Sequence, residues 1–213
     1  MTTKTALIWG AGGGIGQALV KALKGHGWQT VGLYHRPEPV EHEADFRFEA
    51  DVGQEHAVRD AVLSITYEVE KADLFVYTVG DILATPVKEL DAEGWRRILD
   101  ANLTGAYLTT HHSLPLLEEN AHLFYLGAVS ERLRLPGLSA YAAAKAGLEA
   151  FADTVRKEQR QRKVTLVRPV AVDTPLWEKV PMRLPKGAAQ ATKVAGRILD
   201  AYEEGQTGVL NFD

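Results

Sequence analysis

Short apolar runs alternate along the whole chain with longer segments of helical periodicity, and this alternation restricts the fold more than any other feature. It is typical of repeated β-α units, which build a parallel sheet. Several runs, such as Ala6-Leu7-Ile8-Trp9, are apolar at consecutive positions, as expected for strands that are covered by helices on both faces. The sequence therefore predicts an α/β fold with one doubly wound, Rossmann-like parallel sheet of seven strands.

The expected elements follow from this alternation. Strands are predicted at Thr5–Gly10, Thr30–Tyr34, Phe46–Glu49, Leu74–Thr78, His122–Gly127, Val164–Arg168 and Gly208–Asn211. Helices are predicted at Gly14–Leu23, Glu55–Lys71, Ala92–Leu117, Ser139–Gln161 and Ala188–Glu203. No repeat or Pro/Gly-rich linker divides the 213 residues, and we interpret residues 1–213 as a single domain.

Charge and composition exclude several classes of function. The chain has 24 Lys and Arg against 28 Asp and Glu, a formal net charge of −4, and this balance does not favour binding to nucleic acid or to an anionic membrane. Cysteine is absent, which excludes disulfides, thiolate metal sites and a cysteine nucleophile. Neither a secretion signal nor a long apolar segment is recognisable, and we expect a cytoplasmic protein.

A glycine-rich turn, residues 10–16, lies between the first expected strand and the first expected helix. Bare N–H groups at a helix N-terminus bind pyrophosphate, and glycine lets the chain approach it closely. A mononucleotide P-loop would end in Gly-Lys-Ser/Thr, whereas Gln17 and Ala18 follow here, and a methyltransferase turn usually carries an acid where Trp9 stands. A dinucleotide therefore fits best, with a plain flexible turn as the structural alternative.

The end of the second expected strand bears on the choice of dinucleotide. NAD sites usually present an acid to the ribose 2′-hydroxyl about twenty residues after the turn, but this strand ends in His35 and Arg36. A guanidinium can hold a 2′-phosphate through two hydrogen bonds. We therefore expect NADP(H), with NAD(H) as the alternative if Arg36 is an ordinary surface arginine.

Tyr141 and Lys145 form the candidate reactive pair. Their spacing of four puts both on one helix face, where a neighbouring ammonium lowers the pKa of a phenol from about 10. Such a phenol acts as a general acid when a carbonyl-like group receives hydride. The pair alone is a weak signal, because a half-buried tyrosine beside a surface lysine gives the same pattern. Its position after the fifth expected strand, at the edge where ligands bind, supports a site.

Together these motifs resemble the short-chain dehydrogenase/reductase family from Lys4 to about Leu210. The resemblance implies an NAD(P)-dependent oxidoreductase that acts on a small molecule and assembles as a homodimer or homotetramer. It implies that Asn102 holds a proton-relay water and that Asp51 and Val52 flank the adenine. The implied catalytic residues are Tyr141, Lys145 and Asn102. The implied cofactor-binding residues are Gly10, Gly13, Gly14, Ile15, Gly16, His35, Arg36, Asp51, Val52, Gly80, Tyr141, Lys145, Pro169 and Thr174.

Three positions depart from the family pattern. Trp9 replaces a threonine, and Tyr77-Thr78-Val79 replaces Asn-Asn-Ala before Gly80. Ala128 stands thirteen residues before the tyrosine, where the family has a serine that donates a hydrogen bond to the reacting oxygen. Loss of such a donor costs about 3 kcal/mol, roughly a hundredfold in rate. Ser130 would replace it only if the chain bulged, because residues two apart in a strand lie about 6.6 Å apart.

These departures leave the substrate and the class of function open. The dihydropteridine reductases within the family share an alanine at the serine position and a Pro-Val-x-x-Asp-Thr-Pro stretch like residues 169–175, which favours a quinonoid, pterin-like or imine substrate beside a small carbonyl. A catalytically weakened dinucleotide-binding sensor or regulatory protein is the alternative.

Three further features of the sequence bear on function. Adjacent His111 and His112 point about 100° apart on a helix, and with no third ligand at a suitable spacing we expect no metal site. Residues 131–134, Glu-Arg-Leu-Arg, form either a solvated loop or a contact to an anionic group near the substrate. Trp177 either caps the substrate or packs on its own domain.

Overall fold

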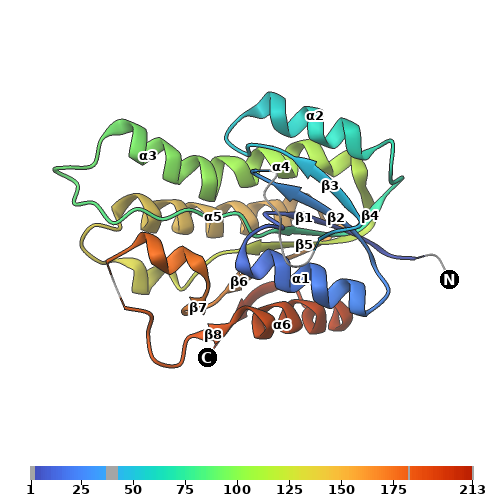
Figure 1. The fold of residues 1–213 in the computed structure, drawn as a ribbon. Coiled ribbons are helices and arrows are strands. Elements are labelled where there is room, and N and C mark those ends of the chain that lie inside the picture. The colour runs from blue at the N-terminus through green and yellow to red at the C-terminus, as the bar shows by residue number, and fades with distance from the viewer. Residues whose placement is uncertain (1–2, 37–42, 182, 213) are drawn as a thin grey trace.

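The computed structural model describes residues 3–36, 43–181 and 183–212, and its centre is a seven-stranded sheet in the order β3-β2-β1-β4-β5-β6-β9 (Figure 1). All six pairings in this sheet are parallel. The strands are β1 Thr5–Trp9, β2 Gln29–Tyr34, β3 Phe46–Glu49, β4 Ala72–Tyr77, β5 Leu117–Leu126, β6 Lys163–Arg168 and β9 Gly208–Asn211. The predicted α/β, doubly wound, seven-stranded fold is confirmed.

Helices cover both faces of the sheet (Figure 1). One layer holds α1 Gly14–Gly25 and α6 Ala191–Glu204, which enclose an apolar cluster with one face of the sheet. The other holds α2 Glu55–Ile65, α3 Ala92–Leu99, α4 Gly105–Ser113 and α5 Ser139–Glu158, and a second, larger cluster lies beneath it. The consecutive apolar residues of β1 are thus buried on both sides, as the sequence predicts.

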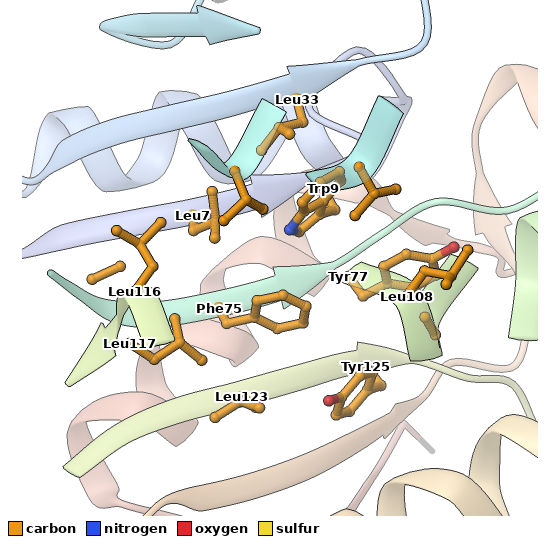
Figure 2. Close-up of a cluster of buried hydrophobic side chains, with 14 of the residues drawn as sticks. Leu7, Trp9, Leu33, Phe75, Tyr77, Leu108, Leu116, Leu117, Leu123 and Tyr125 are labelled. Carbon is orange, nitrogen blue, oxygen red and sulfur yellow. The ribbon is translucent and has the colours of Figure 1, made fainter. Parts of the chain in front are cut away.

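The larger cluster contains a row of three aromatic side chains (Figure 2). Trp9 on β1 pairs in register with Tyr77 on β4, and Tyr77 pairs with Tyr125 on β5. All three are fully buried. The Tyr77 hydroxyl donates a hydrogen bond of 2.8 Å to the carbonyl oxygen of Ala101, so the row also holds the segment that precedes α4. Trp9 and Tyr77, two of the departures from the family pattern, therefore belong to the core.

The helix predicted over residues 92–117 is continuous from Ala92 to Leu116 in the structure, but a π-helical turn interrupts its α-helical hydrogen bonding. After α3 the chain forms a π-helical turn at Asp100–Thr104, and after α4 it forms a 3-10 turn at Leu114–Leu116 before β5 begins. The Asn102 amide donates to the Ile98 carbonyl at 2.8 Å, and a side chain that occupies this carbonyl competes with the regular backbone ladder. Pro115, which has no N–H group, lies where the helix ends.

Other bounds differ from the expectation by a few residues. Helix α2 ends at Ile65 instead of Lys71. A second, two-stranded parallel sheet of β7 Val172–Asp173 and β8 Ala189–Gln190 was not predicted. Strand β7 lies before the 3-10 turn at Pro175–Lys179 and β8 lies after it. Their pairing therefore holds together the two ends of the loop that contains this turn. Among the described helices, none combines the length and apolarity that a bilayer crossing requires.

Buried His122 on β5 makes stability depend on pH. It is 1% exposed, its Nε2 lies 2.8 Å from Thr165 Oγ1, and burial lowers its pKa from 6.5 to about 4, helped by nearby Lys163. Between these values the unfolded chain binds the proton and the folded protein does not. This contribution to the free energy of unfolding is therefore complete above pH 6.5 and falls by on the order of 2–3 kcal/mol toward pH 4.

Urea unfolding at pH 7.5 and pH 4.5 measures this loss. Because carboxylates titrate as well, the comparison is made with His122→Gln, which accepts no proton in this range. We expect the variant to be less stable at pH 7.5 but to lose clearly less stability on acidification. An equal loss in both proteins contradicts the assignment.

Candidate active site

A cavity of about 630 Å³ lies at the carboxyl ends of β1, β4, β5 and β6. Its lining comes from the glycine turn, from the loops that follow β4, β5 and β6, and from the first two turns of α5. The sheet order reverses between β1 and β4, which is where ligands bind in open α/β sheets. The cavity is thus the candidate site.

The glycine turn forms one side of this cavity. Gly10 has a φ of 89°, in the left-handed region that glycine adopts without strain. A Cβ at Gly16 would lie 2.1 Å from the Gly10 carbonyl oxygen, so the turn closes only with glycine there. Gly13, Gly14 and Ile15 line the cavity. Helix α1 has Gly13 as its N-cap, with no side-chain cap and no acid in the first turn, and such a terminus suits a phosphate.

Tyr141 and Lys145 lie on the opposite side, on α5, and both line the cavity. They are 8% and 4% exposed. Lys145 Nζ lies 5.6 Å from the centre of the Tyr141 ring and donates a hydrogen bond of 2.8 Å to the Leu126 carbonyl oxygen at the end of β5. The two side chains are therefore brought together, and the lysine is held by the sheet.

Burial determines the protonation of both groups. It raises the pKa of Tyr141 to about 12 and lowers the pKa of Lys145 to about 8. The expectation that the ammonium lowers the phenol pKa is thus wrong for this structure, because removal from water disfavours the phenolate more strongly. At neutral pH Tyr141 carries its proton, which suits a proton donor.

Asn102, at the π-helical turn, is fully buried. Its amide donates to the carbonyl oxygens of Asp81 at 2.7 Å and Ile98 at 2.8 Å, so its Oδ1 points away from both. This Oδ1 accepts no hydrogen bond from any described residue. A Cβ built at Gly80 would lie 3.3 Å from it and 3.9 Å from Lys145 Nζ. An unsatisfied acceptor thus faces the lysine across a glycine, which is an arrangement that suits a bridging water.

Ala128 lines the cavity where the family has its serine. Ser130 does not line the cavity, and its hydroxyl donates to Glu149 at 3.3 Å. The loop is held in this position by Arg168, which forms an ion pair with Glu131 and donates to the Ala128 carbonyl at 3.3 Å. The suggestion that Ser130 replaces the serine is therefore wrong in this structure.

The other expected cofactor residues divide into two groups. Pro169 and Thr174 line the cavity, and a Cβ at Gly14 would approach Thr174 Cγ2 to 2.9 Å. The second group lies outside the cavity, after the ends of β2 and β3: His35, Arg36, Asp51 and Val52. His35, Arg36 and Asp51 are exposed, whereas Val52 is buried. The amides of Gly10 and Ala11 both donate to the Leu33 carbonyl at 3.0 Å, which joins the glycine turn to this region.

Asp81 is a residue beside the cavity whose supporting contacts the sequence did not indicate. Its carboxylate pairs with Lys179 Nζ at 2.7 Å and with Arg97 Nε at 3.1 Å, and its carbonyl accepts from Asn102. It therefore connects α3 and the Pro175–Lys179 turn beside the cavity. The partners lie up to 98 positions apart, so no local pattern indicates the contact. Trp177, from the same turn, lines the cavity and donates to the Val172 carbonyl at 3.0 Å.

His111 and His112 do not form part of this site. Within the described ranges, no group of three or more His, Asp or Glu side chains is positioned to hold a metal ion. His112 Nε2 lies 3.4 Å from a Glu55 carboxylate oxygen on α2. His112 therefore contacts α2 within the helical layer.

Comparison with known proteins agrees with the fold. Over 194 residues the chain is 29% identical to a 3-oxoacyl-[acyl-carrier-protein] reductase of Synechocystis, covering 84% of this chain and 78% of the relative. A serine 3-dehydrogenase of Rhizobium radiobacter is 29% identical over 180 residues, covering 80% and 72%.

Two solved structures share the fold. Ligand-free aldohexose dehydrogenase of Thermoplasma acidophilum superposes with a TM-score of 0.87 at 21% identity, covering 99% of this chain and 92% of that one. A 3-ketoacyl-(acyl-carrier-protein) reductase from Brucella melitensis, complexed with NADH, has a TM-score of 0.86 at 23% identity, covering 99% and 96%. Residues 4–184 match the sequence profile described as short chain dehydrogenase. The chain belongs to the short-chain dehydrogenase family and is an oxidoreductase of that type.

Proposed function

We propose that this protein uses NADPH to reduce a carbonyl-type group of a small molecule, with Tyr141 as the proton donor. The observation that carries the proposal is the shared cavity: the buried Tyr141 and Lys145 line it on one side, and the uncapped N-terminus of α1 lines it on the other. A dinucleotide whose pyrophosphate lies on that terminus would extend toward the tyrosine.

The chain's own groups divide the chemistry as follows. A bound nicotinamide would supply the hydride. Tyr141, protonated at neutral pH, gives its proton to the substrate oxygen as negative charge develops there. Lys145, when charged, stabilises the phenolate that remains. Asn102 Oδ1 holds a water beside Lys145, and through this water the tyrosine regains its proton. Ile82, Leu138 and Trp177 exclude bulk water from the cavity.

Ala128 bears on the substrate. Without the serine hydroxyl, Tyr141 is the donor that remains to stabilise a developing alkoxide. A substrate that spreads this charge over a conjugated ring needs the missing donor less. The proposed substrate class therefore includes quinonoid, pterin-like and imine compounds beside small carbonyls.

The remaining elements of the proposal concern the cofactor and the assembly. His35 and Arg36 follow β2 at the place where NAD sites usually present an acid, which supports NADP(H) over NAD(H). Trp95 on α3 and Tyr107 on α4 are 38% and 50% exposed, which supports a homodimer or homotetramer that pairs through this layer. We propose that residues 1–213 act as one domain in the cytoplasm.

Replacement of Tyr141 tests the chemistry. We expect Tyr141→Phe to lower kcat/KM for NADPH-dependent reduction by 10²- to 10⁴-fold, because it removes the general acid, and to leave the Kd for NADPH within about twofold. Tyr67→Phe is the matched control, because Tyr67 is 81% exposed, follows the end of α2 and does not line the cavity, and it is expected to retain full activity. Nucleotide binding without turnover in the wild type, on a panel of carbonyls and quinones, would favour the sensor alternative, which Ala128 suggests.

The pH profile tests the role of Lys145. With the pKa of Lys145 lowered to about 8 by burial, the ammonium is present below pH 8 and lost above it. We expect reductive kcat/KM to be constant from pH 6 to 7 and to decline above about pH 8. Lys145→Arg, whose guanidinium keeps its charge, is expected to be slower but to lack this decline. A rate that rises through pH 8 contradicts the role.

Cofactor preference tests Arg36. We expect Arg36→Gln to raise KM for NADPH about 10- to 100-fold through loss of a charge-assisted contact to the 2′-phosphate, with little effect on KM for NADH. The control is Arg160→Gln, at an exposed position after α5. Equal effects on both dinucleotides show that Arg36 does not read the phosphate.

A further inference from the structure

We infer that the substrate carries a carboxylate, held at the opening of the cavity by Arg132 and Arg183. The inference rests on the proposed function, since it assigns the substrate class of the same cavity. It concerns the part of the substrate farthest from the reacting group.

The charge of the cavity lining is of one sign. Among the described residues that line it, the charged side chains are Arg132, Lys145, Lys179 and Arg183, and none is Asp or Glu. The remaining lining around the candidate substrate space is apolar, including Leu133, Leu138 and Trp177. A lining of this kind fits an apolar body that ends in an anion.

Two of these four cations already have partners. Lys145 is bonded to the Leu126 carbonyl, and Lys179 forms an ion pair with Asp81. The side chains of Arg132 and Arg183 form no ion pair or hydrogen bond with any described residue. Both residues are exposed, so they border the opening of the cavity and can reach a ligand there.

Nearby acids do not compensate for these arginines. Glu131 is paired with Arg168, and Asp81 lies between Lys179 and Arg97. Asp173 and Glu178 line a neighbouring hollow beside Trp177 instead of the cavity. Both guanidiniums are therefore open to an anionic group of a ligand, with no competing carboxylate in the described part of the cavity lining.

The position of the two arginines indicates that they bind the substrate and not the cofactor. Arg132 lies in the turn Ser130–Leu133, four residues after Ala128, on the loop between β5 and α5. Arg183 follows the turn that carries Trp177. The sites proposed for the cofactor phosphates, at the N-terminus of α1 and near Arg36, lie on other elements. A carboxylate between the arginines would extend its apolar part inward past Trp177 toward Tyr141.

Guanidinium and carboxylate match in geometry and form two parallel hydrogen bonds. A contact of this kind contributes enough to change binding by about 10- to 100-fold. Because it is made away from the reacting atoms, we expect it to act mainly on KM.

Paired probes test the inference. Phenylglyoxylate and 4-oxopentanoate are compared with their methyl esters as substrates with NADPH, and benzoate is compared with benzamide as a ligand by calorimetry. We expect at least tenfold higher kcat/KM for the acids than for the esters, and tighter binding of benzoate than of benzamide. Arg132→Gln and Arg183→Gln should each reduce kcat/KM for the acids about 10- to 100-fold, mainly through KM, and leave the esters within twofold.

Arg134→Gln is the matched control, because Arg134 is exposed, lies two residues beyond Arg132 and does not line the cavity. It is expected to change neither series. The inference is overturned if the esters react as well as the acids, if the variants lower both series equally, or if no acid is turned over or bound by the wild type. Failure of the proposed function has a different signature, namely no binding of NADPH or full activity in Tyr141→Phe, and benzoate binding can still be measured in that case.

Discussion

The candidate site depends on the register of the central parallel strands, because this register makes β1, β4 and β5 end side by side at one edge of the sheet. Trp9, Tyr77 and Tyr125 lie in register on neighbouring strands, so the residues that follow β1, β4 and β5 emerge at one edge. As a consequence, Gly80 and Ala128 line the same cavity, and Gly10 lies in the glycine turn that forms part of its wall. A slip of one residue would turn the aromatic row to the other face of the sheet and would displace every loop of the site.

The aromatic row also reaches the candidate relay. The Tyr77 hydroxyl holds the Ala101 carbonyl, and Asn102, the next residue, bonds Asp81 just after β4. Asp81 in turn pairs with Lys179 beside Trp177. Two departures from the family pattern, Trp9 and Tyr77, are thus explained by packing. Ala128 is of another kind, because it lines the cavity and removes a donor where the chemistry is proposed.

Burial and charge act in opposite directions within this cavity. Burial raises the pKa of the Tyr141 phenol and lowers the pKa of the Lys145 ammonium, because both ionised forms lose hydration. Arg132 and Arg183, which line the same cavity, are exposed to water. The cavity therefore combines buried groups suited to proton donation with the exposed arginines that we propose to hold an anion.

Local patterns in the sequence predicted what depends on near neighbours along the chain. The alternation of apolar and helical segments identified the sheet, and β3 and β9 have the predicted bounds. The four-residue spacing alone put Tyr141 and Lys145 on one helix face. The glycine turn was recognisable because the contact that requires glycine at position 16 is made to Gly10, within the turn itself.

Tertiary contacts decided the rest. The π-helical interruption of the predicted helix 92–117 involves Asn102, whose amide is shared with a carbonyl after β4. Ser130 turns toward Glu149, nineteen positions away, and the direction of the Tyr141 pKa follows from burial by several elements at once. Arg132 and Arg183 line one cavity although their loops lie some fifty positions apart in the sequence. Periodicity reports which face of its own element a residue occupies, whereas the partners it meets and the water it loses depend on how distant segments pack.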